Sequence, residues 1–340
     1  MIFVTGATGL IGSFLLHELQ ARGLAVRALH RSAAPIDAFP GVEWVQGNIL
    51  DATLLASAIS PEVTHVFHCA GLVSYAPQDE DALLENNVEG TAAIVDACLA
   101  RPGIRLGYVS SVAALGSPAE AKDELLTAAP QIVTEKATWD LGASHPAYAT
   151  SKYLGELEVW RGAAEGLAAV IVNPSVVVGP GDWQRSSTRL LRYAYDEHRF
   201  YTKGLLNFVD VRDVVAQLIR LMLDLPLPAT ERYILNGGTY PLGDFLQDAA
   251  IALGRRPPTV AVPDWAAEII WRLEHGRAIL TGARPLITRD TARAGRQHIY
   301  YDASKVQQST GLSFRPLSET IAWATQGLKT NRTSPHTVVS

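Results

Sequence analysis

Cysteine is scarce in this sequence, and so are the features of disulfide-rich, metal-binding or membrane-spanning proteins. The 340 residues contain only Cys69 and Cys98, so no disulfide framework is predicted and a reducing, cytoplasmic location is expected. The nine histidines show no His-x-x-x-His spacing and the cysteines no Cys-x-x-Cys spacing, so we predict no metal site. No run reaches the roughly 18 apolar residues of a membrane span, and the first residues have the pattern of a core strand, not of a signal peptide.

Positive charge is not in excess either. The chain has 29 Lys and Arg residues against 34 Asp and Glu, a formal net charge of −5 and a pI near 6.0. This balance argues against nucleic acid or an anionic membrane as the main partner. With 48% hydrophobic and 19% charged residues, the composition is that of a globular protein large enough for one domain with an appended lobe, or for two domains.

The first 31 residues contain the most informative pattern of the chain. Residues 2–4 are a short apolar run typical of a buried strand, and the stretch TGATGLIG follows at residues 5–12. Behind it, apolar residues recur at helical spacing up to Gly23, and residues 25–29 have the pattern of a second strand. This order predicts a strand–helix–strand unit.

Each glycine of the turn has a mechanical reason in a dinucleotide site. Gly6 permits a tight turn off the strand, Gly9 lets the backbone approach a pyrophosphate, and Gly12 lets the helix pack closely on the sheet. Free N–H groups and the positive helix end attract the phosphates. A plain glycine-rich turn is the alternative interpretation. The turn residues expected to hold the cofactor are Thr5, Gly6, Thr8, Gly9, Leu10, Ile11 and Gly12.

The end of the second strand favours NADP(H) over NAD(H). An NAD site needs a carboxylate there for the ribose hydroxyls, but the strand ends with His30 and Arg31. Arg31 can hold a 2′-phosphate through charge-assisted hydrogen bonds, whereas Arg27 is expected to point elsewhere because strand side chains alternate. The alternative is that Arg31 is a solvated surface residue.

The spacing Gly-x-x-Gly-x-x-Gly in TGATGLIG resembles the cofactor loop of the extended short-chain dehydrogenase/reductase superfamily. That branch includes sugar-nucleotide epimerases, dihydroflavonol reductases and 3β-hydroxysteroid dehydrogenases. The resemblance covers roughly residues 1–330. It implies an α/β protein with a Rossmann-type, doubly wound parallel sheet and a smaller C-terminal α/β lobe for the substrate.

The expected domain organisation follows from where the strand–helix alternation breaks down. Residues 1–180 are predicted to form the NADP-binding domain, to which the chain returns near residues 207–236. Residues 181–328 are expected to form mainly the substrate-binding lobe. The polar, proline-containing residues 329–340 are predicted to be a disordered tail.

The resemblance implies further cofactor contacts at the ends of later strands. Asn48 stands where the family usually has an aspartate near the adenine, and its amide oxygen can still accept from the adenine amino group. Ile49 would pack on the ring, although Asn48 could instead be a simple turn former. The other residues expected beside the cofactor are Cys69, Ala70, Gly71, Pro174, Ser175 and Val177.

Tyr148 and Lys152 are four residues apart, so they share one face of a predicted helix. Together with Ser111 at a strand end, they match the superfamily's Ser-Tyr-Lys triad. Ser111 is chosen over Ser110 because the resembled pattern places the catalytic serine five residues before a glycine, here Gly116. Ser110 is then expected to support the backbone beside the cofactor.

The triad is expected to handle a proton. When hydride reaches a carbonyl carbon, negative charge grows on the oxygen, and a positioned acid must supply a proton. A free tyrosine titrates near 10, so Lys152 is expected to lower the pKa of Tyr148 and to hold ribose hydroxyls as well. Ser111 is expected to donate a hydrogen bond to the same substrate oxygen.

The motifs favour reversible reduction of a ketone or aldehyde on a fairly apolar small molecule. Residues 112–114 read Val-Ala-Ala, whereas sugar-nucleotide dehydratases carry an Asp-Glu pair just after the catalytic serine. The segments at residues 26–31, 301–305 and 311–317 are similar to the dihydroflavonol reductase branch. The expected substrate contacts are Ser74, Tyr75 and Trp183.

Two other functions stay open at this point. One is an NAD(P)-dependent epimerase or dehydrogenase of nucleotide sugars, in which Arg189 and Arg192 would bind a diphosphate. The other is a non-catalytic, redox-sensing module of the same fold, although such proteins often lose the tyrosine. By analogy with relatives, a homodimer is expected to pair through the helices that begin at Asp79 and Tyr148.

Overall fold

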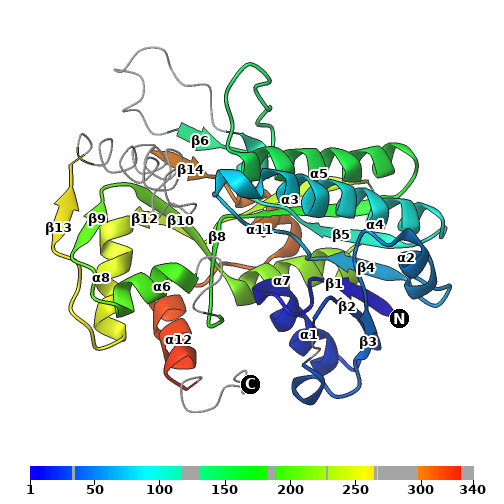
Figure 1. Ribbon diagram of the computed structural model, residues 1–340, viewed down its shortest axis with the longest axis horizontal. Helices are drawn as coiled ribbons and strands as arrows, with labels where there is room; N and C mark the ends of the chain where they lie inside the picture. The colour runs from blue at the N-terminus through cyan, green and yellow to red at the C-terminus, as the bar shows by residue number, and fades with distance from the viewer. Residues whose placement is uncertain are drawn as a thin grey trace.

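A seven-stranded parallel sheet organises the larger part of the computed structural model (Figure 1). The structure describes residues 1–32, 35–116, 131–182, 188–226, 229–263, 266 and 298–330. The strand order is β11-β7-β5-β4-β1-β2-β3, and each neighbouring pair is parallel. The strands are β1 (Ile2–Thr5), β2 (Val26–His30), β3 (Glu43–Gln46), β4 (His65–His68), β5 (Arg105–Val109), β7 (Ala168–Pro174) and β11 (Glu231–Leu235). The predicted doubly wound α/β fold is confirmed.

Helices cover both faces of this sheet because its strands are apolar on both sides. In β1, Ile2 and Val4 belong to a core shared with α1 (Leu10–Ala21) and α7 (Val211–Ile219). Phe3 points the other way, into a core with α2 (Ala52–Ala58), α4 (Gly90–Leu99) and α5 (Ala147–Ala164). Figure 1 shows α4 and α5 on one side of the sheet and α1 and α7 on the other.

The remaining elements gather mainly at one end of the sheet, on the left in Figure 1. A three-stranded sheet of β12 (Gly238–Pro241), β10 (Leu205–Asp210) and β8 (Val176–Val178) packs with α6 (Thr188–Tyr195), α8 (Leu242–Ala252) and α12 (Leu317–Thr330). Two parallel pairs accompany it, β9 (Phe200–Thr202) with β13 (Val260–Val262) and β6 (Gln131–Val133) with β14 (Ile299–Tyr301). Helix α11 (Ser304–Thr310) contacts β11.

Short helical turns complete the chain. The predicted long helix over residues 79–99 is divided into α3 (Glu80–Leu84), a π-helical turn η3 (Glu85–Glu89) and α4. The other turns are η1 (Ile36–Ala38), η2 (Pro77–Asp79), η4 (Val112–Leu115) and η5 (Arg220–Asp224). No helix within the described ranges is long and apolar enough to cross a membrane.

The predicted division into a cofactor domain and a substrate lobe stays a prediction. Helix α12 continues to Thr330, two residues into the segment expected to be a tail. Residues 331–340 lie outside the described residues. Polar contacts join α12 to the start of α7, since Asp210 accepts a hydrogen bond from Thr320 Oγ1 at 2.9 Å and Arg212 pairs with Glu319 at 3.3 Å.

Candidate active site

The glycine turn after β1 has no room for side chains at Gly6 and Gly12. Gly6 has a φ of +67°, and a Cβ there would lie 2.5 Å from the backbone nitrogen of Ala70. A Cβ at Gly12 would lie 2.1 Å from the carbonyl oxygen of Gly6. Helix α1 then begins at Leu10, and no side chain caps its first turn. The turn could therefore hold an anionic group on its backbone N–H groups, which fits the pyrophosphate of a dinucleotide.

The side chain of Thr5, at the end of β1, is occupied within the protein. Its hydroxyl lies 2.7 Å from Nδ1 of His68 on β4 and accepts from the backbone N–H of Ala70 at 3.3 Å. The other nitrogen of His68 lies 3.0 Å from Thr91 Oγ1. Burial lowers the pKa of His68 to about 3, and the nearby charge of Lys152 acts in the same direction. Thr5 thus joins two central strands, and its predicted contact with the cofactor stays a prediction.

The end of β2 leaves Arg31 accessible. The Arg31 guanidinium donates one hydrogen bond of 3.3 Å to Asn86 Oδ1, at an exposed position. His30 contacts Ser32 through its ring nitrogen and meets the Trp44 ring edge-on, with 5.7 Å between centroids. Arg27 points away, as predicted, and donates to Glu43 Oε1 at 2.8 Å. Arg31 could therefore meet a ligand phosphate at this strand end.

Asn48 and Ile49 follow β3 as expected, but both make internal contacts. The Asn48 side-chain oxygen accepts a hydrogen bond from the backbone of Leu50 at 3.2 Å, which agrees with the turn-forming interpretation. Ile49 is buried, and its Cγ2 would lie 3.0 Å from a Cβ at Gly90 on α4. Their proposed places beside the adenine stay predictions.

The segments after β4 and β7 approach the glycine turn and the triad. Cys69 and Ala70 form the backbone that a Cβ at Gly6 would strike, and a Cβ at Gly71 would lie 2.9 Å from Lys152 Nζ. Burial raises the pKa of the Cys69 thiol to about 12, so it stays protonated. Pro174 ends β7, Ser175 lies between β7 and β8, and Val177 is in β8. Beyond β8, a Cβ at Gly179 would lie 3.6 Å from Leu10 Cδ1 at the start of α1.

The predicted triad residues come together at the start of α5. Tyr148 and Lys152 are both buried, and Ser111 is close enough to Tyr148 to influence the pKa of its phenol. Lys152 Nζ donates to the carbonyl oxygen of Val109 at 3.1 Å. Ser111 begins η4, where its Oγ accepts from the backbone N–H of Ala113 at 3.2 Å. The arrangement places a hydroxyl, a phenol and an ammonium at the carboxyl end of β5.

The electrostatics of the triad differ from the sequence-based expectation. Burial raises the pKa of Tyr148 above its ordinary value, and Tyr75 adds to the rise, while the neighbouring Ser111 opposes it. Burial also lowers the pKa of Lys152 to about 8, against the opposing charge of Glu156. The prediction that Lys152 lowers the pKa of Tyr148 is not borne out in the free protein, because loss of hydration dominates and no contribution of Lys152 offsets it.

Ser110 and Asn87 make hydrogen bonds that hold the backbone around the triad. The backbone N–H of Ser110 donates to Val172 on β7 at 2.8 Å, as expected for a backbone support. Asn87 lies in the π-helical turn η3 and donates to the carbonyl oxygen of Leu72 at 2.9 Å and to Ser151 Oγ at 3.0 Å. It thereby ties the segment after β4 to α5.

The three residues expected to contact the substrate differ in their surroundings. The ring of Tyr75 is half exposed and meets the Tyr148 ring edge-on, with 5.6 Å between centroids. Ser74 donates its hydroxyl to Asp79 Oδ2 at 2.6 Å. Trp183 lies outside the described residues. Tyr301 on β14 was not expected in the site, yet it is close enough to Tyr75 for that residue, together with burial as the larger cause, to raise its pKa to about 12.

The comparisons with known proteins agree with this geometry. The model of the NAD dependent epimerase/dehydratase family matches residues 2–233. The chain belongs to this family. It is 33% identical over 329 residues to a putative dihydroflavonol 4-reductase of Synechocystis, covering 94% of this chain and 92% of the relative. It is also 32% identical over 283 residues to sterol demethylase protein B of Methylococcus capsulatus, covering 82% and 80%.

Among solved structures, gox2253 has a TM-score of 0.80 and 29% identity, with 97% of this chain and 98% of that chain covered. This member of the epimerase/dehydratase family is thus an NAD(P)-dependent oxidoreductase of the extended short-chain dehydrogenase/reductase type. The predicted relationship to the dihydroflavonol reductase branch is confirmed.

Gly6→Ala tests the glycine turn. The substitution forces a Cβ against the backbone of Cys69 and Ala70, just after β4, at a φ of +67°, so we expect NAD(P) affinity to fall roughly tenfold or more, which is about 1.4 kcal/mol. Gly23→Ala is the matched control, because Gly23 has a φ of +69° with nothing within 4 Å of the added Cβ. Titration calorimetry and urea unfolding separate binding from stability. Equal affinities of the two variants would contradict this role of Gly6.

Proposed function

We propose that the protein is an NADPH-dependent oxidoreductase that reversibly reduces a ketone or aldehyde of a fairly apolar small molecule to an alcohol. The observation that carries the proposal is that the buried Tyr148, Ser111 and Lys152 come together at the carboxyl end of β5. Lys152 lies one helical turn further along α5. This is the set of groups that a carbonyl reduction needs for binding the oxygen and supplying a proton.

The proposed cofactor is NADP(H), with NAD(H) as the weaker candidate. Gly6, Gly9 and Gly12 would receive the pyrophosphate, and Lys152 would hold ribose hydroxyls. The exposed guanidinium of Arg31, at the end of β2, would pair with the 2′-phosphate. The further proposed contacts are Thr5, Thr8, Leu10, Ile11, His30, Asn48, Ile49, Cys69, Ala70, Gly71, Ser110, Pro174, Ser175 and Val177.

In the proposed reaction, Tyr148 is the general acid and Ser111 positions the substrate oxygen. When bound, the reduced nicotinamide supplies the hydride for the carbonyl carbon. The raised pKa of Tyr148 keeps its phenol protonated at neutral pH, so the proton that reduction requires is already on the oxygen. Alcohol oxidation needs the phenolate and should therefore become faster as the pH rises toward that pKa.

Aromatic and apolar groups around the triad support an apolar substrate. Tyr75 presents a half-exposed ring beside Tyr148, and Val73 is exposed in the same segment. The relative in Synechocystis is named as a reductase, which also supports reduction. The nucleotide-sugar alternative is less well supported, because Arg192 is already paired with Asp196 at 3.1 Å. An intact triad also argues against a non-catalytic sensor.

Tyr148→Phe tests the proposed mechanism. Loss of the general acid should lower turnover roughly 10²- to 10⁴-fold, while NADPH affinity stays close to that of the wild type. Lys152→Ala should weaken NADPH binding as well. The measurement is NADPH consumption against a panel of ketones, flavanonols, steroids and nucleotide sugars. Near-normal turnover of Tyr148→Phe would refute the mechanism, and nucleotide-sugar turnover without net cofactor oxidation would favour an epimerase.

Arg31→Ala tests the choice of cofactor. Removing the guanidinium should reduce the ratio of kcat/KM for NADPH to that for NADH by roughly tenfold or more, because a charge-assisted contact with the phosphate is lost. Arg22→Ala is the control, since Arg22 is a similarly accessible arginine that pairs with Glu18 and Asp224 instead. A wild-type protein that uses both cofactors equally, or prefers NADH, would refute the assignment of Arg31.

A further inference from the structure

A buried carboxylic acid, Glu156, lies on the same face of α5 as Tyr148 and Lys152. Glu156 follows Lys152 by four residues, as Lys152 follows Tyr148, so the three side chains line one side of the helix. Only 1% of Glu156 is exposed, although glutamate is rarely buried without a partner. A buried carboxylate at this position needs an explanation, because burying a charge is costly.

Two polar contacts connect Glu156 to the rest of the site. The amide of Asn173 on β7 donates to Glu156 Oε1 and also to the carbonyl oxygen of Ser111, at 2.9 Å. Arg232 Nη1 on β11 lies 3.5 Å from Glu156 Oε2. The carboxylate therefore stands between a fixed arginine and the amide that holds the backbone of Ser111.

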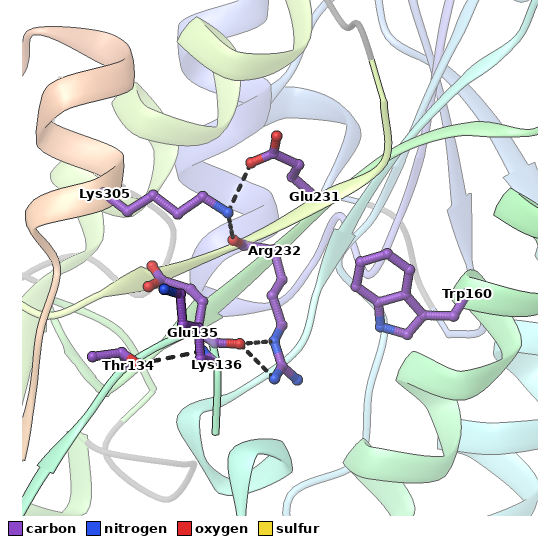
Figure 2. A pocket seen from close by; sticks show the side chains of 7 residues that line it. All are labelled: Thr134, Glu135, Lys136, Trp160, Glu231, Arg232 and Lys305. Carbon is purple, nitrogen blue, oxygen red and sulfur yellow. Dashed lines mark hydrogen bonds and ion pairs between the residues drawn. The ribbon is translucent and has the colours of Figure 1, made fainter. Parts of the chain in front are cut away.

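Arg232 is itself held in place, as Figure 2 shows. It lies in the wall of a pocket of about 670 Å³, where it donates to the carbonyl oxygens of Glu135 at 2.9 Å and Ala137 at 2.6 Å. Lys305 in the same pocket is paired with Glu231 at 2.7 Å. These two cations thus have internal partners, and the pocket reaches the outer end of the Glu156 network.

Among the described residues, the other ionisable groups around Lys152 and Glu156 stay neutral at neutral pH. Burial lowers the pKa of His68 to about 3 and raises that of Cys69 to about 12. Burial likewise raises the pKa values of Tyr108 and Tyr148. The charge on Lys152 is therefore set mainly by its burial and by Glu156, with Arg232 on the far side of that carboxylate.

We propose that Glu156 is a positioning residue whose buried carboxylate keeps Lys152 protonated and, through Asn173, fixes the backbone of Ser111. Burial raises the pKa of Glu156, and Asn173 and Arg232 oppose this rise and so favour the ionised carboxylate. The consequence for the reaction rests on the proposed function, in which Lys152 and Ser111 serve the cofactor and the substrate. The electrostatic part concerns the free protein and does not depend on that function.

Glu156→Gln tests the proposal because it removes the charge and keeps an oxygen that can accept from Asn173. The chain has six lysines, so the ε-carbon signal of Lys152 can be followed by NMR after selective ¹³C labelling and assigned with Lys152→Arg. We expect the pKa of Lys152 to fall by about one pH unit or more. Glu158→Gln is the matched control on the same helix, where Glu158 pairs with Arg161, and it should leave the pKa unchanged.

An unchanged Lys152 pKa in Glu156→Gln would overturn the proposal. If that variant does not fold, Glu156→Asp decides, because it retains the charge but withdraws it by one methylene. A smaller downward shift supports the proposal, and no shift overturns it.

The functional arm is the pH dependence of NADPH binding. As the pH is raised, the NADPH affinity of Glu156→Gln should begin to fall at a lower pH than that of the wild type, because Lys152 loses its proton earlier. A uniform loss of affinity at every pH would show a structural role only and overturn the proposal. A Lys152 shift in a protein that reduces no carbonyl would support the charge assignment and refute the proposed function instead.

Discussion

The burial of one polar face of α5 is the constraint on which the site depends. Tyr148, Lys152 and Glu156 are all buried, and they lie against the carboxyl ends of β4, β5 and β7. Loss of hydration favours the neutral forms of the lysine and the tyrosine, and the carboxylate opposes this effect for the lysine. Close packing has a steric condition as well, because a Cβ at Gly155 would lie 2.6 Å from Tyr108 Oη. The helix can bring its polar groups to the sheet only where small residues allow it.

Local patterns were enough to predict the parts of the site that lie within one element or one turn. The strand–helix–strand unit follows from hydrophobic spacing, and the need for glycine at Gly6 and Gly12 follows from turn geometry, as the close contacts there confirm. The shared face of Tyr148 and Lys152 follows from helical periodicity alone. Ser111 could be added to the predicted site because parallel strands bring their carboxyl ends to the same edge of the sheet.

Contacts between distant segments could not be predicted in this way. Tyr301 reaches the neighbourhood of Tyr75 only because β14 pairs with β6, and Arg232 meets Glu156 only because β11 joins the sheet beside β7. The raised pKa of Tyr148 also depends on contacts between distant segments. Sequence shows a lysine one turn away, but the loss of hydration that dominates the pKa depends on the whole packed environment. The phenol of the free protein is therefore a weaker acid than its sequence neighbours alone suggest.

The pKa of Tyr148 in the free protein tests this account most directly. The ζ-carbon signals of ¹³C-labelled tyrosines can be followed by NMR across alkaline pH, with the Tyr148→Phe variant identifying the relevant signal. We expect Tyr148 to titrate above the ordinary value of about 10, because its phenol is buried beside Tyr75. A pKa at or below that value would show that the lysine charge outweighs burial, and would contradict the account of a triad governed by loss of hydration.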